Sequence, residues 1–155
     1  MTTSLVQVPS IIYFTSAGYA KLPAELARLQ LYREEVVVRL QKAREQGDLS
    51  ENGAYKAARF ELSDTDRNIR RVQYQIKYGR AVQPPTDGSV GIGSVVTLEK
   101  ADGKTVNYTI VGTYEADPLG GKISPESPMG QALMGKRVGA SIEVNGNQFI
   151  LKQIA

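Results

Sequence analysis

The sequence predicts an α+β protein in which an antiparallel two-helix coiled-coil arm is followed by a small α+β domain. Apolar residues recur at spacings of three and four through most of residues 22–79, which is typical of amphipathic helices. Eleven of the fifteen glycines lie in residues 81–155, together with β-branched runs, and Pro84-Pro85 stands between the two regions. We therefore expect a coiled-coil hairpin domain over residues 1–82 and a second domain over residues 83–155.

The first half contains two apolar seams of helical period. One seam runs from Leu22 to Ala43 and is interrupted by Arg33, and the other runs from Tyr55 to Gly79. A short loop that contains glycine joins them, so each helix is expected to supply the apolar partner of the other. At 1.5 Å per residue, helices of this length predict an arm on the order of 40 Å long.

The start of the first helix carries two local signals. Pro23 is expected either in the first turn, where its missing N–H is tolerated, or at a kink. Thr15 or Ser16 is expected to cap a short turn before it.

The second half is typical of two β-hairpins with one short helix between them. Ser127 followed by Pro128 predicts a helix start and Gly135 predicts a stop, which gives a helix of about two turns. Asn145-Gly146 is the strongest short hairpin signal. The hairpins are predicted over residues 95–99 and 105–111, around Ala101-Asp102-Gly103, and over residues 141–144 and 148–152, around Asn145-Gly146.

The composition excludes several classes of chemistry. The chain has no Cys, His or Trp, so it contains no thiol nucleophile, zinc finger, Ser-His-Asp triad or disulfide. Residues 1–10 do not have the pattern of a signal peptide, and no segment stays apolar for the roughly 18 residues of a membrane helix. We expect a cytoplasmic protein without a membrane partner.

The basic charge lies in the first half of the chain. Residues 1–80 hold 13 basic and 9 acidic side chains, whereas residues 81–155 hold 6 and 7. On the second helix a basic stripe occupies a sector of roughly 80°, about 120° from the apolar seam, and Asp66 interrupts it. The stripe fits attraction to a phosphate backbone or to an acidic protein channel, and equally a solvated coiled-coil flank. Its members are Lys56, Arg59, Arg67, Arg70 and Lys77.

The loop between the helices contains two acids, Asp48 and Glu51, at a spacing that places them on one side of the hairpin tip. Two carboxylates are suitable oxygen ligands for Mg²⁺. Asp48 as helix cap with Glu51 three residues later is a simpler explanation, because it requires no function, and from spacing alone it is favoured. A long arm that carries two acids at its end instead favours the explanation that they are ligands of Mg²⁺.

Several segments of this chain resemble the bacterial Gre transcript-cleavage factors, which rescue backtracked RNA polymerase. The resemblance covers nearly the whole chain, and its most specific part combines Gly, Asp, Glu, Asn and Tyr at fixed spacing inside a coiled coil. Gly53 and Ala54 depart from the residues usual in the family. The similar segments are residues 14–19, 22–26, 43–59, 93–96 and 123–135.

The resemblance implies a C-terminal domain similar to FKBP-type prolyl isomerases and an arm that enters the secondary channel of RNA polymerase. It implies that Asp48 and Glu51 help to hold a Mg²⁺ ion shared with the polymerase, and that Tyr55, Lys56 and Arg59 support the tip and the nascent RNA 3′ end. It further implies docking at the channel rim by residues around the predicted short helix, with Met129 as an exposed anchor or as part of the core. These docking residues are Ser127, Pro128 and Met129.

Three functions are compatible with these features. The first is Mg²⁺-dependent endonucleolytic cleavage of the nascent RNA by a catalytic accessory factor that is not itself an enzyme and binds no Mg²⁺ alone. The second is a non-cleaving channel regulator, and the third is a prolyl isomerase, which rests on fold analogy only. We expect a monomer whose partners are bacterial RNA polymerase and RNA, with non-specific contact to nucleic acid as a further expectation.

Overall fold

The computed structural model describes residues 9–155, which form two compact units. One unit is Ala20–Tyr78, and the other combines the described residues up to Tyr19 with Gly79–Ala155. No helix among the described residues is long and apolar enough to cross a membrane. The expectation about a signal peptide falls mostly on residues 1–8, which lie outside the described part.

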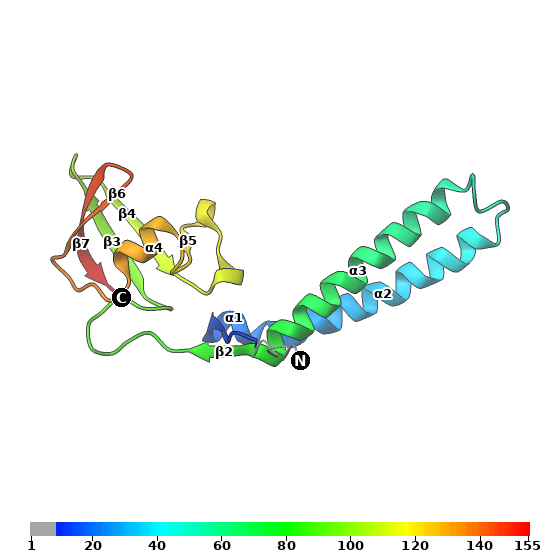
Figure 1. Ribbon diagram of the computed structural model, residues 1–155, viewed down its shortest axis with the longest axis horizontal. Helices are drawn as coiled ribbons and strands as arrows, with labels where there is room; N and C mark the ends of the chain where they lie inside the picture. The colour runs from blue at the N-terminus through cyan, green and yellow to red at the C-terminus, as the bar shows by residue number, and fades with distance from the viewer. Residues whose placement is uncertain (1–8) are drawn as a thin grey trace, which may run out of the picture. The chain divides into compact units, whose positions relative to one another are not determined.

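The first unit is the predicted helical hairpin. Helix α2 (Leu22–Arg44) and helix α3 (Gly53–Tyr78) run side by side in opposite directions (Figure 1). Pro23 lies in the first turn of α2, as the sequence predicts. The side chains that the two helices bury all belong to the predicted seams except that of Gln75: Leu22, Leu29, Val36 and Ala43 from α2, and Ala58, Thr65, Ile69, Val72 and Gln75 from α3.

Two ion pairs join the helices beside the seam. Arg33 contacts Asp66 at 2.6 Å, which explains why a cation interrupts the apolar spacing of α2. Arg39 holds both carboxylate oxygens of Glu61, at 2.8 and 2.9 Å. The hydrogen bonds from Arg39 lower the pKa of the Glu61 carboxyl, so this acid is ionised at neutral pH.

A five-stranded sheet forms most of the second unit. Its strands are in the order β5-β4-β3-β7-β6, and all neighbours are antiparallel except the β4–β5 pair. Helix α4 (Pro128–Leu133) packs on the core of this sheet. The strands are β3 (Val95–Lys100), β4 (Thr105–Ile110), β5 (Lys122–Ile123), β6 (Ser141–Val144) and β7 (Asn147–Ile154), and the short 3-10 helices are η1 (Thr113–Glu115) and η2 (Pro118–Gly120).

Both predicted hairpins and the predicted helix are present. The β6–β7 turn places Asn145 at φ 52° and Gly146 at φ 78°, the left-handed conformations for which these two residues are suited. Ser127 caps α4, because its Oγ accepts a hydrogen bond of 3.0 Å from the N–H of Gly130. Local turn and cap chemistry was therefore a correct guide to these elements.

A two-stranded parallel sheet was not predicted. Strand β1 (Ile12–Thr15) pairs with β2 (Gly79–Val82), and the short helix α1 (Ser16–Ala20) follows β1. The hydroxyl of Thr15 accepts a hydrogen bond of 3.0 Å from the N–H of Gly18, which makes it the expected cap.

The carboxylate of Glu115 joins β1 to the loop after β4. It accepts hydrogen bonds from the N–H and hydroxyl of Thr15, at 2.8 and 2.5 Å, and from the N–H of Gly112 at 3.0 Å. Packing therefore groups β1 and β2 with the C-terminal sheet, whereas the sequence places a domain boundary between residues 82 and 83. That boundary stays a prediction about which segments fold by themselves.

Candidate functional site

The tip loop, residues 45–52, is held by one side chain that contacts both helices of the hairpin. The amide oxygen of Asn52 accepts a hydrogen bond of 3.1 Å from the N–H of Tyr55, and its amide nitrogen donates to the carbonyl of Ala43 at 2.5 Å. Asn52 thus caps the start of α3 and satisfies a carbonyl at the end of α2. Sequence reasoning missed this residue.

The capping explanation for Asp48 and Glu51 is wrong. Helix α3 begins at Gly53, so neither acid occupies the cap position. Asn52 caps this helix instead. Both acidic side chains are exposed. The structure therefore removes helix capping as an explanation for these two acids.

Asp48 is held in an ionised form within the loop. Its Oδ1 accepts hydrogen bonds from the N–H of Ser50 at 3.0 Å and from the Ser50 hydroxyl at 2.9 Å. These bonds lower the pKa of the Asp48 carboxyl, because they favour its charged form. Within residues 9–155 no donor contacts Oδ2, which leaves one carboxylate oxygen open.

Glu51 makes no hydrogen bond or ion pair with any described residue, so its carboxylate is free to accept a ligand. Two exposed carboxylates are the kind of oxygen donors that Mg²⁺ takes, usually alongside water and substrate phosphates. Residues 9–155 contain no group of three or more Asp or Glu side chains that would hold a metal by themselves. The two carboxylates are oxygen donors of the kind that a hard divalent cation takes.

The first turns of α3 bring two further predicted residues together. The guanidinium carbon of Arg59 lies 5.8 Å from the ring centre of Tyr55, a cation–π contact one helical turn apart. Tyr55 is half-buried, whereas Lys56 is exposed. The contact therefore stabilises the positions of the Arg59 and Tyr55 side chains directly beside the tip loop.

The basic stripe of α3 is less interrupted than the sequence indicates. Asp66 turns to Arg33 of α2, and the other two acids of α3 are also in ion pairs, Glu61 with Arg39 and Asp64 with Arg67 at 3.3 Å. Arg67 is thus the one cation of the stripe with a carboxylate partner among the described residues. Arg71, which lies outside the predicted stripe, is also exposed on α3.

The predicted docking residues lie at the start of α4 and have different environments. Ser127 caps the helix, its hydroxyl donating to the carbonyl of Ser124 at 2.7 Å, and Pro128 is exposed. Met129 is half-buried and packs against the sheet core, so the expectation of an exposed anchor is wrong at this position. The exposed methionine of this region is Met134, just after α4.

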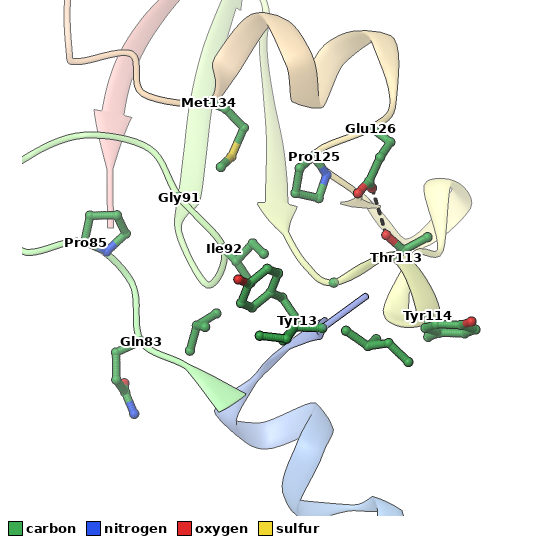
Figure 2. Close-up of a pocket in the computed structure, with 14 residues that line it drawn as sticks. Tyr13, Gln83, Pro85, Gly91, Ile92, Thr113, Tyr114, Pro125, Glu126 and Met134 are labelled. Carbon is green, nitrogen blue, oxygen red and sulfur yellow. Dashed lines mark hydrogen bonds between the residues drawn. The ribbon is translucent and has the colours of Figure 1, made fainter. Parts of the chain in front are cut away.

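A largely apolar cavity of about 600 Å³ lies within the second unit beside the segment that precedes α4. Figure 2 shows one wall, where the hydroxyl of Thr113 donates to the carboxylate of Glu126 at 2.8 Å. Sequence reasoning missed this cavity, because its residues come from segments far apart in the chain. Its lining includes Tyr13, Ile92, Tyr114, Pro125 and Met134.

Comparisons with known proteins agree with this architecture. Residues 12–80 match the family model "Transcription elongation factor, N-terminal", and residues 85–152 match "Transcription elongation factor, GreA/GreB, C-term". The chain belongs to the GreA/GreB family of transcription elongation factors. The family models therefore cover both the arm and the C-terminal sheet.

Individual relatives of this GreA/GreB chain are similar over most of its length. Transcription elongation factor GreA of Thermomicrobium roseum is 40% identical over 86% of this chain and 87% of the relative. GreA of Sphingopyxis alaskensis is 38% identical over 96% of this chain and 94% of the relative. Among solved structures, the GreA factor homolog 1 of Thermus thermophilus is 28% identical over 94% of this chain and 99% of that chain, with a TM-score of 0.45.

Proposed function

We propose that this GreA/GreB protein binds bacterial RNA polymerase in the cytoplasm, inserts its arm into the secondary channel and stimulates Mg²⁺-dependent endonucleolytic cleavage of the nascent RNA in backtracked complexes. The observation that carries the proposal is the state of Asp48 and Glu51. Both acids lie exposed in the tip loop, and neither is used to cap a helix. A two-carboxylate tip on a coiled coil is suited to completing an active site that belongs to another protein.

The two carboxylates would act as oxygen donors at the reacting centre. Mg²⁺ supplies charge stabilisation and an activated water in phosphodiester hydrolysis. Asp48 would contribute its open Oδ2, while Ser50 holds Oδ1, and Glu51 would contribute a carboxylate with no competing partner among the described residues. Because two acids do not form a complete site, the protein would be a catalytic accessory and not an enzyme in isolation.

The residues around the tip would position these acids and the RNA. Asn52 fixes the loop to both helices, so the acids are presented by a braced hairpin end. The Tyr55–Arg59 pair and Lys56 present an aromatic ring and cations next to them, which favours contact with the displaced RNA 3′ end.

The second unit would dock on the rim of the polymerase channel. Pro128 is exposed at the start of α4, and the apolar cavity beside Pro125 and Met134 offers a contact surface for a protein partner. With docking on one unit and chemistry on the other, tethering raises the effective concentration of the tip at the active centre.

The test is cleavage in a purified, stalled and backtracked elongation complex with Mg²⁺. The proposal predicts that the wild-type protein shortens the RNA from its 3′ end and restores elongation. A protein that binds the polymerase and slows it without shortening the RNA would instead be the non-cleaving channel regulator.

A further inference from the structure

The tip loop ends in Asn52, which is followed by Gly53, and an asparagine before a glycine is the pair most prone to deamidation. In this reaction the main-chain nitrogen of the glycine attacks the side-chain amide carbon of the asparagine. Glycine favours the attack because it has no side chain to hinder the approach. The chain contains two such pairs, Asn52-Gly53 and Asn145-Gly146, and their surroundings differ.

The main-chain nitrogen of Gly53 is open to reaction. Gly53 is the first residue of α3, where an N–H group has no partner within the helix, and it donates to no other residue in the described part of the chain. Gly53 is exposed, and a Cβ added to it would meet no heavy atom within 4 Å. The nucleophile of the reaction is therefore accessible in the folded protein.

Two hydrogen bonds hold the side-chain amide of Asn52. Its oxygen accepts from the N–H of Tyr55 at 3.1 Å, and its nitrogen donates to the carbonyl of Ala43 at 2.5 Å. These bonds fix the amide, so its reaction with Gly53 requires the cap to open. Opening is local, because it releases the end of a hairpin and no strand pairing.

The second pair is held by the sheet. Asn145 and Gly146 form the turn between β6 and β7, and Val144 lies opposite Asn147 at the base of this turn. Strand β7 also pairs with β3, so the turn is attached to the middle of the sheet. Reaction at Asn145 therefore requires the end of a β-ladder to separate, which is a larger opening than the loss of one cap.

We propose that Asn52-Gly53 is a modification site at which the tip deamidates and thereby loses cleavage activity. The nitrogen of Gly53 forms a bond to Cγ of Asn52, the bond from Cγ to the amide nitrogen breaks, and ammonia leaves. Water then opens the resulting cyclic imide and gives aspartate or isoaspartate. The net change consumes one water and releases one ammonia, and nothing is oxidised or reduced.

Either product alters the cap of α3. Aspartate keeps an acceptor for the N–H of Tyr55 but has no donor for the carbonyl of Ala43, and it adds a carboxylate next to Glu51. Isoaspartate also inserts a methylene group into the main chain directly before the helix. We expect faster opening of the first turn of α3 and slower RNA cleavage. The expected effect on cleavage rests on the proposed function.

Ageing the purified full-length protein in water enriched in ¹⁸O measures the reaction directly. The entering oxygen comes from the solvent, so the label marks deamidation that occurs before digestion. Trypsin releases residues 45–56, in which Asn52 is the only asparagine, and residues 138–152, which contain Asn145. Mass spectrometry should show deamidation of residues 45–56 at least about fivefold faster than that of residues 138–152. Equal rates, or faster reaction at Asn145, would overturn the proposal.

The matched control is Gly53→Ala. The space beside Gly53 is open and alanine is the better helix former, so the variant should fold normally. Its methyl group hinders the attacking nitrogen, so Asn52 should deamidate at least about fivefold more slowly, while the rate at Asn145 stays unchanged. Deamidation of Asn52 at the wild-type rate in this variant would contradict the proposal.

RNA cleavage by aged protein connects the modification to activity. In a backtracked elongation complex the wild type should lose rate in proportion to the converted fraction of Asn52, and aged Gly53→Ala should keep the rate that it had when fresh. A wild-type protein that is largely converted at Asn52 but cleaves at its fresh rate would overturn the proposal.

The outcome is separable from that of the proposed function. Peptide mapping and hydrogen exchange at the first turn of α3 require no polymerase, so they report modification and cap loss by themselves. If fresh protein fails to cleave RNA, the proposed function is wrong. If fresh protein cleaves RNA but residues 45–56 stay unmodified, the deamidation proposal fails and the proposed function stands.

Discussion

The side-chain nitrogen of Asn52 lies 2.5 Å from the main-chain oxygen of Ala43, so a residue before the first turn of α3 is bonded to the last turn of α2. The same amide caps α3 through its oxygen. Because the acids of the tip lie between these two residues in the chain, the bond closes the loop that carries them.

Replacing Asn52 by alanine should destabilise the tip and reduce cleavage. The loss of a helix cap costs about 1 kcal/mol, and the carbonyl of Ala43 loses its partner as well. Hydrogen exchange should show faster opening of the first turn of α3, while the sheet of the second unit is unchanged. Asn52→Asp keeps the acceptor and removes the donor, so its exchange rate should lie between those of the wild type and the alanine variant. An alanine variant with wild-type exchange at the tip would show that the cap is unimportant.

The pKa of Asp48 should lie below the ordinary value for aspartate, because the N–H and the hydroxyl of Ser50 donate hydrogen bonds to its charged form. The stability that these two bonds give the folded loop is therefore fully present at pH values above the ordinary pKa of aspartate. It is lost as the pH falls through the lowered pKa of Asp48. Ser50→Ala removes the hydroxyl donor and should move the pKa upward. Carbon-detected NMR titration of the Asp48 carboxyl measures both values, and an identical pKa in the two proteins would contradict the assignment.

Replacing Glu115 by alanine should destabilise the second unit by about 1.5–3 kcal/mol, since a carboxylate that accepts bonds from Thr15 and Gly112 is removed. Glu115→Gln keeps one acceptor oxygen, so this variant should lose less stability than the alanine variant. Gly112→Ala should also be poorly tolerated, because the added Cβ would lie 1.9 Å from the carbonyl oxygen of Tyr13. Thermal unfolding measures all three, and an alanine variant at Glu115 with an unchanged midpoint would refute this account of the contact.

Reversing Arg59, Arg67 and Arg70 to glutamate should weaken engagement of the backtracked complex, more at low salt than at high salt. The reason is that screened charge attraction is the expected cause. Arg70→Glu and Arg28→Glu form a matched pair, because both arginines are exposed but only Arg70 belongs to the basic stripe of α3. An effect of equal size at all ionic strengths would point to packing, and circular dichroism would then show whether α3 has unfolded.

The elements that the sequence predicts well are those with local signals. The 3-4 apolar spacing predicts α2 and α3, and Asn145-Gly146 predicts the β6–β7 turn, because in each case the residues that determine the conformation are neighbours in the chain. The β1–β2 pair was missed because it joins segments 67 residues apart, each of only four residues. Such pairing depends on tertiary contacts like that of Glu115 with Thr15.

The candidate site was predicted in its residues but not in its local chemistry. Spacing locates Asp48 and Glu51, yet it assigned the helix cap to Asp48, because Asp and Asn are equally good caps and α3 begins later than expected. Spacing also treated Asp66 as a break in the basic stripe, whereas its partner Arg33 lies on the other helix. Met129 shows the same limit, since only packing distinguishes an exposed anchor from a core residue.

The central claim is that the carboxylates of Asp48 and Glu51 drive RNA cleavage. The most direct measurement is the rate of RNA shortening in a purified backtracked elongation complex with Asp48→Asn or Glu51→Gln, across a range of Mg²⁺ concentrations and at saturating factor. We predict a loss of at least about tenfold in rate, equivalent to about 1.4 kcal/mol of activation free energy, with helical content and competition for polymerase unchanged. Wild-type rates for Asp48→Asn at every Mg²⁺ concentration would contradict the account.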